Sequence, residues 1–514
     1  MQCLQHTQRL ACRCSMNIDI NKKEIVEYCL KKKVLITPTL LSMVHTIADV
    51  DMWITNHENK SFSTGSQETS NQQQIITSPP QNTTTSVLHF HPSYEILFNY
   101  STPPRKISVQ DFVHYFRSRF SQMEKLLSHR QELSSLSTIA HVRQKPPRES
   151  TNFIGMLTEK QITKNKHIIL QFEDGTGTIK CLVSKNSPIY STAEDMVDDE
   201  IVGVVGAPSQ GGLFFVENIL SPDIPLYTEK KQCPDEVYCA ILTDMQIGAI
   251  DFMEEQFITF LKWIRGEHGT PEEQDIASKV AYILIVGDAV DGVGIHPRQE
   301  SVLKIKDIDE QYTHLAELLR QIPERIQLFL SLGNHDATRL SEPQPPLSER
   351  FKKSFQGMNN ILFISNPSML LVHKTATFSG YKFLLYHGCS YLYYAEKVPS
   401  IKNSGKKVAE RTDMVMKFLL QKRHLAPSYG SWLCIPDAVD NMIISDIPDF
   451  FVSGHLHRPA TTTYRGTTII CGSCWQPQNE YQKRQNHEPI PGMVPIINMK
   501  TRDVSFMDFS GGIR

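Results

Sequence analysis

The pattern of apolar and polar positions changes character several times along the 514 residues of the chain. Residues 16–56 place apolar side chains at helical spacing and predict a small helical domain. Residues 57–87 are polar and poor in aromatic side chains, so they cannot bury a core and we expect a disordered linker. Residues 1–15 show no recognisable pattern. We interpret them as a doubtful extension, with translation starting at Met16, or as a short disordered tail.

A longer helical segment is expected within residues 88–148. Ser108 is a candidate N-cap of its helix, with Asp111 in the first turn. One face of this helix would be apolar and would consist of Phe112, Phe116, Phe120, Met123 and Leu127. We expect the arginines of the helix to lie on its solvated face, and contact with nucleic acid is the alternative.

Residues 149–225 have the period of strands instead. Five short β-rich runs, from "NFIGMLTE" to "LFFVENI", are separated by turns that contain Gly or Asp. This arrangement predicts a small five-stranded barrel of the OB type. Such barrels often bind single-stranded nucleic acid with aromatic side chains over a basic groove. The predicted strands offer few aromatics beyond Phe172, Phe214 and Phe215, so a structural or partner-binding barrel is an equal alternative.

Over residues 226–514, apolar runs alternate with amphipathic stretches. The runs "VYCAILT", "AYILIVG", "IQLFLSL" and "YKFLLYH" are typical of buried strands, whereas "FMEEQFITFLKWIRGE" and "IDEQYTHLAELLRQI" are typical of helices with one apolar face. This alternation predicts an α/β sheet with helices on its faces. Together with the preceding parts, it predicts a multidomain α+β protein.

Composition changes this picture only a little. The net charge of −2 gives no global electrostatic reason to bind nucleic acid, so any such role needs a local basic surface. Eleven scattered cysteines fit a reducing compartment better than a disulfide framework. We expect no membrane span, because no apolar stretch of roughly 18 residues occurs. The first residues also lack the apolar core of a secretory signal.

Five short motifs follow the buried strands and carry the candidate chemistry. They are "TDMQ" with Asp244 and Gln246, "VGDAVDG" with Asp288, "LGNHD" with Asn334, His335 and Asp336, "LYHG" with His387, and "SGHLH" with His455 and His457. Ligand sites in open α/β sheets lie at the carboxyl ends of strands, so all five motifs can converge. Residues two positions apart in an extended segment point the same way, which directs the paired ligands of the first and last motifs toward one site.

The residue types define the class of metal site. Carboxylate, amide oxygen and imidazole groups without a thiolate suit Mn²⁺, Fe or Zn²⁺ rather than a structural cysteine zinc site. Two metal ions roughly 3.5–4 Å apart need a bridging group, for which a carboxylate serves. Such a pair activates a water molecule and stabilises both oxygens of a displacement at phosphorus. Each motif alone is a weak or moderate signal, but the ordered set indicates a dinuclear phosphoesterase site.

With these motifs the chain resembles the calcineurin-like metallophosphoesterase superfamily, and within it the small subunits of the archaeal D-family DNA polymerase. The order of helical domain, linker, barrel and phosphoesterase domain, the phrase "SPDIP" at 221–225 and the late runs "CWQPQNEYQ" and "PGMVPIINM" add to the resemblance. It implies a two-sheet calcineurin-like domain over 226–514 that acts as a proofreading 3′→5′ exonuclease, in a heterodimer with the large catalytic polymerase subunit. It further implies primer–template and single-stranded DNA as ligands, the sliding clamp as a contact of the complex, and a place in the cytoplasm at the nucleoid.

The resemblance also implies a role for each site residue. The ligands of one metal ion would be Asp244, Gln246 and His457. The ligands of the second would be Asn334, His387 and His455, with Asp288 bridging the two ions. His335 would be no ligand and would stabilise the phosphate charge or protonate the leaving 3′-oxygen. Asp336 would orient His335 through a hydrogen bond.

Gln246 stands where such sites usually carry a histidine. Its amide oxygen is neutral, as imidazole is, but it suits harder metal ions. We therefore expect the site to bind two divalent ions, with Mn²⁺ as the preferred metal, Mg²⁺ as the alternative, and Zn²⁺ or Fe as the least favoured. Every other ligand position carries the expected residue type, which favours an active nuclease. The competing hypotheses are an inactive scaffold subunit that stabilises the large subunit, and a stand-alone phosphoesterase for small phosphates.

Several residues near the motifs have an ordinary structural interpretation. Asp291 and His296 are expected in a solvated loop, with contact to substrate as the alternative. Cys389 is expected to pack rather than to bind a metal ion. Cys471 and Cys474 form a single C-x-x-C pair, which is too few ligands for a zinc site, and are expected to be structural.

Overall fold

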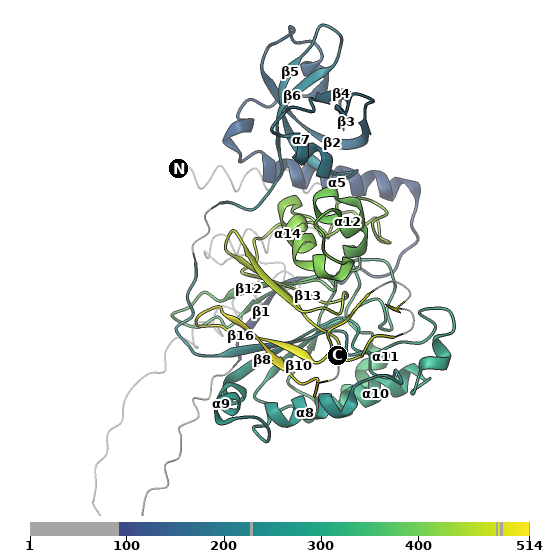
Figure 1. The fold of residues 1–514 in the computed structure, drawn as a ribbon, viewed down its shortest axis with the longest axis vertical. Helices are drawn as coiled ribbons and strands as arrows, with labels where there is room; N and C mark the ends of the chain where they lie inside the picture. Colours follow the sequence, from purple (N-terminus) through teal and green to yellow (C-terminus); the bar gives the residue numbers. More distant parts are fainter. Residues whose placement is uncertain (1–91, 227–229, 480–481, 484–486, 513–514) are drawn as a thin grey trace, which may run out of the picture. The chain divides into compact units, whose positions relative to one another are not determined.

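The computed structural model describes residues 92–226, 230–479, 482–483 and 487–512 (Figure 1). The extension 1–15, the helical domain expected over 16–56 and the linker expected over 57–87 therefore lie outside the described residues. The described residues belong to one compact unit, residues 86–514. None of the helices in the described ranges is both long enough and apolar enough to cross a membrane.

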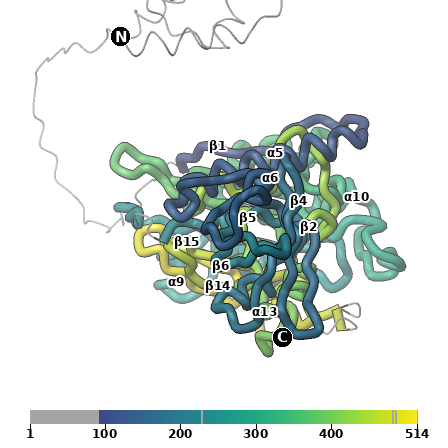
Figure 2. The backbone as a smooth tube through the Cα atoms, turned by 90° about the horizontal axis from the view of Figure 1, so that it is seen from above, coloured from purple at the N-terminus to yellow at the C-terminus, as the bar shows by residue number. Residues whose placement is uncertain are grey.

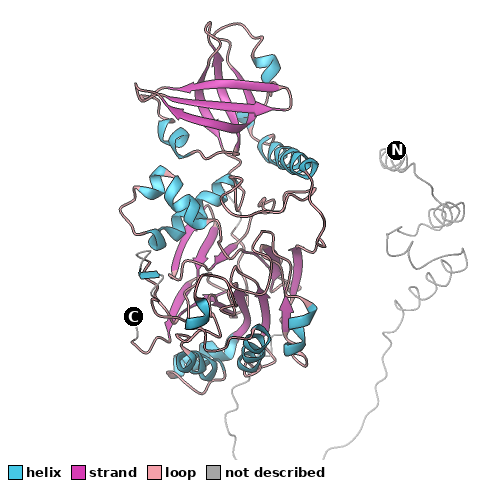
Figure 3. Cartoon of the chain, turned by 90° about the vertical axis from the view of Figure 1, so that its right-hand side faces the viewer, coloured by secondary structure: helices cyan, strands magenta, loops and turns pink. Residues whose placement is uncertain are grey.

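Two six-stranded sheets pack face to face in the C-terminal part of the chain (Figures 1 and 3). The first sheet has the order β10 (Ile361–Phe363), β9 (Gln327–Ser331), β8 (Val280–Val286), β7 (Tyr238–Leu242), β16 (Met493–Asn498), β17 (Val504–Asp508). The second has the order β1 (Tyr94–Asn99), β11 (Ser368–Val372), β12 (Tyr381–Leu385), β13 (Phe450–Ser453), β15 (Thr467–Cys471), β14 (Ala460–Tyr464). The four strands β10 to β7 are parallel, as are β12, β13 and β15.

Helices cover the outer face of each sheet. The first sheet packs against α8 (Glu254–Ile264), α9 (Pro271–Lys279) and α10 (Ile308–Leu319), with the short α11 (Glu349–Lys352) beside them. The second packs against α12 (Tyr391–Lys397), α13 (Pro399–Lys402) and α14 (Thr412–Lys422). Because β8 is covered on both faces, all seven of its residues are buried, which explains its continuous apolar run. The prediction of sheets with helices on their faces is confirmed.

A closed five-stranded barrel precedes this domain. Its order is β2 (Thr151–Ile162), β3 (Ile168–Asp174), β4 (Gly177–Val183), β6 (Phe214–Leu220), β5 (Ile201–Pro208), with the short α6 (Ile139–Val142) and α7 (Tyr190–Asp195) beside it. The rings of Phe153, Phe172 and Phe214 fill its centre, and the predicted barrel is confirmed. Residues 151–220 carry nine Asp and Glu side chains against five Lys and no Arg. This excess of acidic residues disfavours binding of phosphate backbones.

The segment 88–148 is not helical throughout. It contains α5 (Val109–Leu127), but residues 94–99 form β1, which pairs antiparallel with β11 at the edge of the second sheet. The mostly exposed segment "YEILFN" becomes a strand because β11 offers it a free edge, a tertiary partner that helical periodicity does not reveal. Figure 2 shows α5 beside the barrel, where its residues Met123 and Leu127 pack against apolar side chains of β2 and β5.

Arg119 of α5 corrects the expectation that the arginines of this helix face solvent. Its guanidinium is 2% exposed and donates at 2.7 Å to the Asp440 carboxylate, at 2.6 Å to Pro427 O and at 2.8 Å to the Tyr115 hydroxyl. The pair links α5 to the loop before β13. A second buried pair, Lys422 with Glu200 at 2.8 Å, joins α14 to the start of β5.

Candidate metal centre

The five motifs lie just beyond the carboxyl ends of five strands. Asp244, Asp288 and Asn334 follow β7, β8 and β9 of the first sheet, whereas His387 and His455 follow β12 and β13 of the second. The centre therefore lies where the carboxyl ends of the two sheets meet, and the predicted ligands come together there.

The side chain of His387 is at the middle of this cluster. Its Nε2 lies 3.2 Å from Asp288 Oδ2, 3.2 Å from Asn334 Oδ1 and 3.3 Å from Nδ1 of His455. Oxygens of Asp244 and Asp288 and a ring nitrogen of His387 all lie within 4.8 Å of one another. His457 completes the arrangement, with its Nε2 3.3 Å from Asp244 Oδ1.

Five of the predicted ligands have left-handed backbone. The φ angles are +48° for Asp244, +50° for Gln246, +49° for Asp288, +72° for His455 and +54° for His457. A residue other than glycine costs on the order of 1–3 kcal/mol in such a conformation, and persists there only where its surroundings fix it. Strained residues of this kind gather at functional sites, which supports one for this cluster.

Glycines in the motifs permit the close approach of the ligands. A Cβ on Gly333 would lie 2.2 Å from Asp288 Oδ1, and one on Gly287 would lie 2.1 Å from Nδ1 of His387. Both distances are far below van der Waals contact, so no larger residue fits at either position without displacing a ligand.

The charge states of two of the predicted ligands suit metal binding. Burial by itself raises the pKa of Asp288, but the positive charges of His387 and His335 hold it well below its usual range. Burial, together with the neighbouring charge of His387, lowers the pKa of His455 to about 3. An ionised carboxylate and a neutral imidazole are the forms in which these side chains bind metal ions.

His335 does not have the partner expected for it. Its Nδ1 lies 2.9 Å from the backbone oxygen of Asp291 and 3.6 Å from the Asp291 carboxylate. The Asp336 carboxylate instead accepts hydrogen bonds from the backbone N–H groups of Gly333 at 2.8 Å and Val290 at 3.3 Å, and from the Tyr312 hydroxyl. Asp336 therefore connects the "LGNHD" motif to the "VGDAVDG" motif. Asp291, which was expected in a solvated loop, is buried beside His335.

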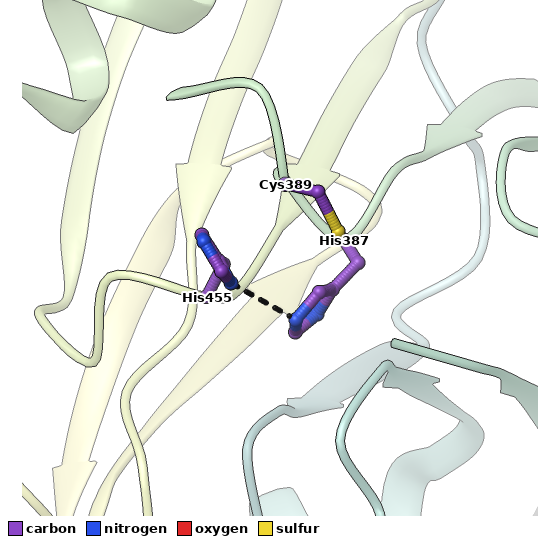
Figure 4. Close-up of side chains that lie close together, drawn as sticks. All are labelled: His387, Cys389 and His455. Atoms are coloured by element: carbon purple, nitrogen blue, oxygen red, sulfur yellow. Dashed lines mark hydrogen bonds between the residues drawn. The ribbon is translucent and has the colours of Figure 1, made fainter. Parts of the chain in front are cut away.

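Other residues outside the motifs hold the ligands in place. The Asn366 side-chain oxygen accepts the backbone N–H of His387 at 2.8 Å, and Gln482 Nε2 lies 2.9 Å from His457 Nδ1. Cys389 lies beside His387 and His455, as Figure 4 shows. Burial and the nearby Glu342 raise the pKa of its thiol well above its usual value. Such partners come from distant loops, so sequence spacing does not reveal them.

The chain is similar to known proteins over most of its length. Residues 239–459 match the calcineurin-like phosphoesterase family. The chain is 37% identical over 392 residues to the DNA polymerase II small subunit of Methanothermobacter thermautotrophicus, a match that covers 76% of this chain and 78% of that protein. The chain belongs to the family of archaeal DNA polymerase II small subunits. The resemblance inferred from the motifs is thereby confirmed.

Two further relatives show the extent of the match. The small subunit of Archaeoglobus fulgidus is 34% identical over 393 residues, which cover 76% of this chain and 75% of that protein. The small subunit of Pyrococcus abyssi is 35% identical over 409 residues. That match covers 79% of this chain but only 64% of the relative's own length.

The donor set fits divalent metal ions. Asp244 and Asp288 are buried carboxylates, and buried negative charge requires a compensating positive charge. The Gln246 amide oxygen is buried and lacks a hydrogen-bond partner, which costs about 1–3 kcal/mol unless another group binds it. Nε2 of His387 can carry one hydrogen but faces three ligand atoms. A cation among these atoms would satisfy all of them.

Proposed function

We propose that the chain is a metal-dependent 3′→5′ exonuclease that removes mismatched nucleotides from a primer end for a large polymerase subunit. The observation that carries the proposal is the buried cluster of Asp244, Asp288 and His387. Gln246, whose amide oxygen is buried without a hydrogen-bond partner, is joined to Asp288 by its backbone N–H, which donates to Asp288 O at 2.9 Å. A scaffold that had lost metal binding would gain stability by pairing or removing this amide oxygen.

Seven residues would hold the two ions, in the roles that the family resemblance gives them. Asp244, Gln246 and His457 would bind one ion, Asn334, His387 and His455 the other, and Asp288 both. The 3.3 Å distance from Asp244 to His457 and the contacts of His387 with Asp288, Asn334 and His455 support this division. When bound, the pair of ions supplies an activated water and stabilises charge at the phosphate.

His335 would act on the leaving group. Its backbone N–H donates to Asp288 Oδ1 at 2.8 Å, which holds it against the bridging carboxylate, and its ring is partly exposed. Burial by itself lowers the pKa of His335, but the carboxylates of Asp288 and Asp291 raise it to about 9. A protonated imidazole can stabilise the phosphate charge and give its proton to the leaving 3′-oxygen.

Asp291 would position His335, and replacing it tests this role. A positioned proton donor contributes roughly 10²- to 10⁴-fold to rate. Asp291→Asn keeps the backbone oxygen that binds His335 but removes the carboxylate that raises its pKa. We expect kcat to fall about tenfold and the alkaline limb of the kcat–pH profile to move to lower pH, with KM and metal content unchanged. An unshifted profile would remove Asp291 from the mechanism.

The metal preference would follow from Gln246, and the ions we propose are two Mn²⁺, with Mg²⁺ as the substitute. Gln246→His should strengthen Zn²⁺ binding roughly tenfold and weaken the preference for Mn²⁺, because imidazole suits Zn²⁺ better than an amide oxygen does. Competition titrations of the metal-free protein measure both changes. If affinity and preference stay as they were, Gln246 is not a ligand.

The decisive experiment for the proposed activity follows the ends of the DNA. The full chain is incubated with Mn²⁺ and a 5′-labelled primer that carries a 3′-mismatch. A 3′→5′ exonuclease produces a ladder that shortens one nucleotide at a time, and a matched primer end shortens more slowly. His455→Ala should remove the ladder. If the parent protein produces no ladder, alone or with its large subunit, the chain is a scaffold, and faster cleavage of a small phosphodiester would indicate a general phosphoesterase.

The partner in this proposal is the large catalytic subunit of the polymerase. The acidic barrel suits contact with a protein surface better than contact with DNA, since nine acidic side chains oppose five lysines over residues 151–220. Primer–template and single-stranded DNA would bind at the metal centre rather than on the barrel. The sliding clamp would contact the assembled polymerase rather than this chain alone.

A further inference from the structure

A second cluster of metal-binding side chains lies away from the candidate metal centre. The Cys233 thiol, an Asp235 carboxylate oxygen and a ring nitrogen of His373 all lie within 4.8 Å of one another. Cys233 and Asp235 belong to the segment between the barrel and β7, and His373 directly follows β11. Tyr282, which contacts His373, stands near the start of β8, whereas Asp288 follows its end. The two sites are therefore separated by roughly 20 Å along one strand.

The cluster is buried and its geometry is fixed. Cys233 and His373 are almost completely buried, whereas the Asp235 side chain is 27% exposed. Nε2 of His373 lies 3.1 Å from Asp235 Oδ2. His373 has a φ of +61°, a conformation that a residue other than glycine keeps only where its surroundings hold it. The His373 ring is thus held facing the Asp235 carboxylate. His455 and His457 of the candidate metal centre have the same kind of left-handed backbone.

Tyr282 supplies the support that a metal-binding histidine needs. Its hydroxyl lies 3.0 Å from His373 Nδ1, accepts the Ser93 N–H at 2.9 Å and can donate to Ser93 O at 3.2 Å. If Nδ1–H donates to this oxygen, the Tyr282 hydroxyl and the Ser93 backbone groups are paired. Nε2 then faces Asp235 as a second acceptor, and a cation between the two acceptors would satisfy both. Metal-bound imidazoles almost always donate their other N–H in this way.

We propose that Cys233, Asp235 and His373 bind one Zn²⁺ ion, with water as the fourth ligand on the open side of Asp235. Tetrahedral zinc with nitrogen and oxygen ligands at about 2.0 Å sets them about 3.3 Å apart, close to the 3.1 Å between His373 and Asp235. A thiolate with an imidazole selects Zn²⁺ over Mn²⁺. Binding releases the Cys233 proton to solvent and fastens the segment before β7 to the end of β11.

The test uses the full chain freed of metal and titrated with Co²⁺. A cobalt ion bound by Cys233 gives a near-ultraviolet thiolate-to-cobalt absorption that saturates at one ion per chain. Cys233→Ala should abolish this absorption. Cys389→Ala, a matched loss of a buried thiol beside the catalytic ligands, should leave it unchanged. The absence of the absorption in the parent, its survival in Cys233→Ala, or its loss in Cys389→Ala would each overturn the proposal.

Two further variants keep the test independent of the folding of Cys233→Ala. Asp235→Asn preserves the size of a partly exposed side chain, and Tyr282→Phe removes only the hydroxyl that supports His373. We expect zinc affinity, measured by competition with a chelator, to fall about 10- to 100-fold in each. Unchanged affinity in both variants would show that the three side chains form a hydrogen-bonded cluster only. Nuclease activity is not the readout, so this result stands apart from the proposed function.

Discussion

Asp288→Asn should reduce metal-dependent nuclease activity by about 10³-fold or more. A catalytic metal ion supplies several kcal/mol of stabilisation to the transition state, and about 1.4 kcal/mol corresponds to tenfold in rate. Asp288 is buried, lies next to His387 and accepts the backbone N–H of His335, so it is joined to residues that follow strands of both sheets. Asparagine keeps the size and the accepting oxygen but removes the charge that would bind both ions.

The measurement pairs initial rates with metal content. Asp288→Asn should retain fewer than two metal ions per chain, while the thermal unfolding midpoint stays near that of the parent because the shape is preserved. Asp275→Asn, on the exposed side of α9, is the matched control and should change neither quantity. Activity close to that of the parent in Asp288→Asn would exclude the bridging role and the dinuclear mechanism with it.

The sequence predicted which side chains gather at the candidate metal centre, because these residues follow strand ends. A parallel strand fixes the position of the first residues after it, so Asp244, Asp288 and His455 could be brought together by chain order alone. Their left-handed backbone was not foreseeable, since it follows from contacts between loops rather than from residue type. The one departure from the usual ligand set, Gln246, proved informative through its unpaired oxygen.

The residues that were placed incorrectly depend on loops and on distant partners. Asp291 lies three positions after Asp288, and the path of that loop brings it next to His335. The Asp336 carboxylate points away from His335 and accepts the Gly333 N–H instead. β1 forms because β11 leaves an edge to pair with, which no local pattern encodes. Arg119 was expected in solvent because arginine usually is, and its partner Asp440 stands 321 positions later in the chain.

Arg119→Met should destabilise the protein by about 3–5 kcal/mol, the usual effect of removing one partner of a buried ion pair. Methionine keeps much of the volume of the arginine side chain but leaves the Asp440 carboxylate, which is fully buried, without its guanidinium. Arg265→Met removes an exposed pair with Glu267 and should leave the urea midpoint unchanged. Adding Asp440→Asn to Arg119→Met should recover part of the loss, because no charge is then buried alone.

The pH dependence of this effect separates lost charge pairing from lost packing. Burial by itself raises the pKa of Asp440, but His424 and Arg119 hold it well below its usual range. A carboxyl with a depressed pKa stabilises the fold above its unfolded pKa of about 4, and the stabilisation is lost as the pH falls through the folded value. In Arg119→Met the pKa of Asp440 in the folded protein rises. The unpaired carboxylate therefore lowers the free energy of unfolding at neutral pH, and this loss disappears when the carboxyl takes a proton. The difference in unfolding free energy between parent and Arg119→Met should therefore shrink as the pH falls through the raised pKa of Asp440 in the variant and on through its depressed pKa in the parent, whereas a packing defect would keep it constant.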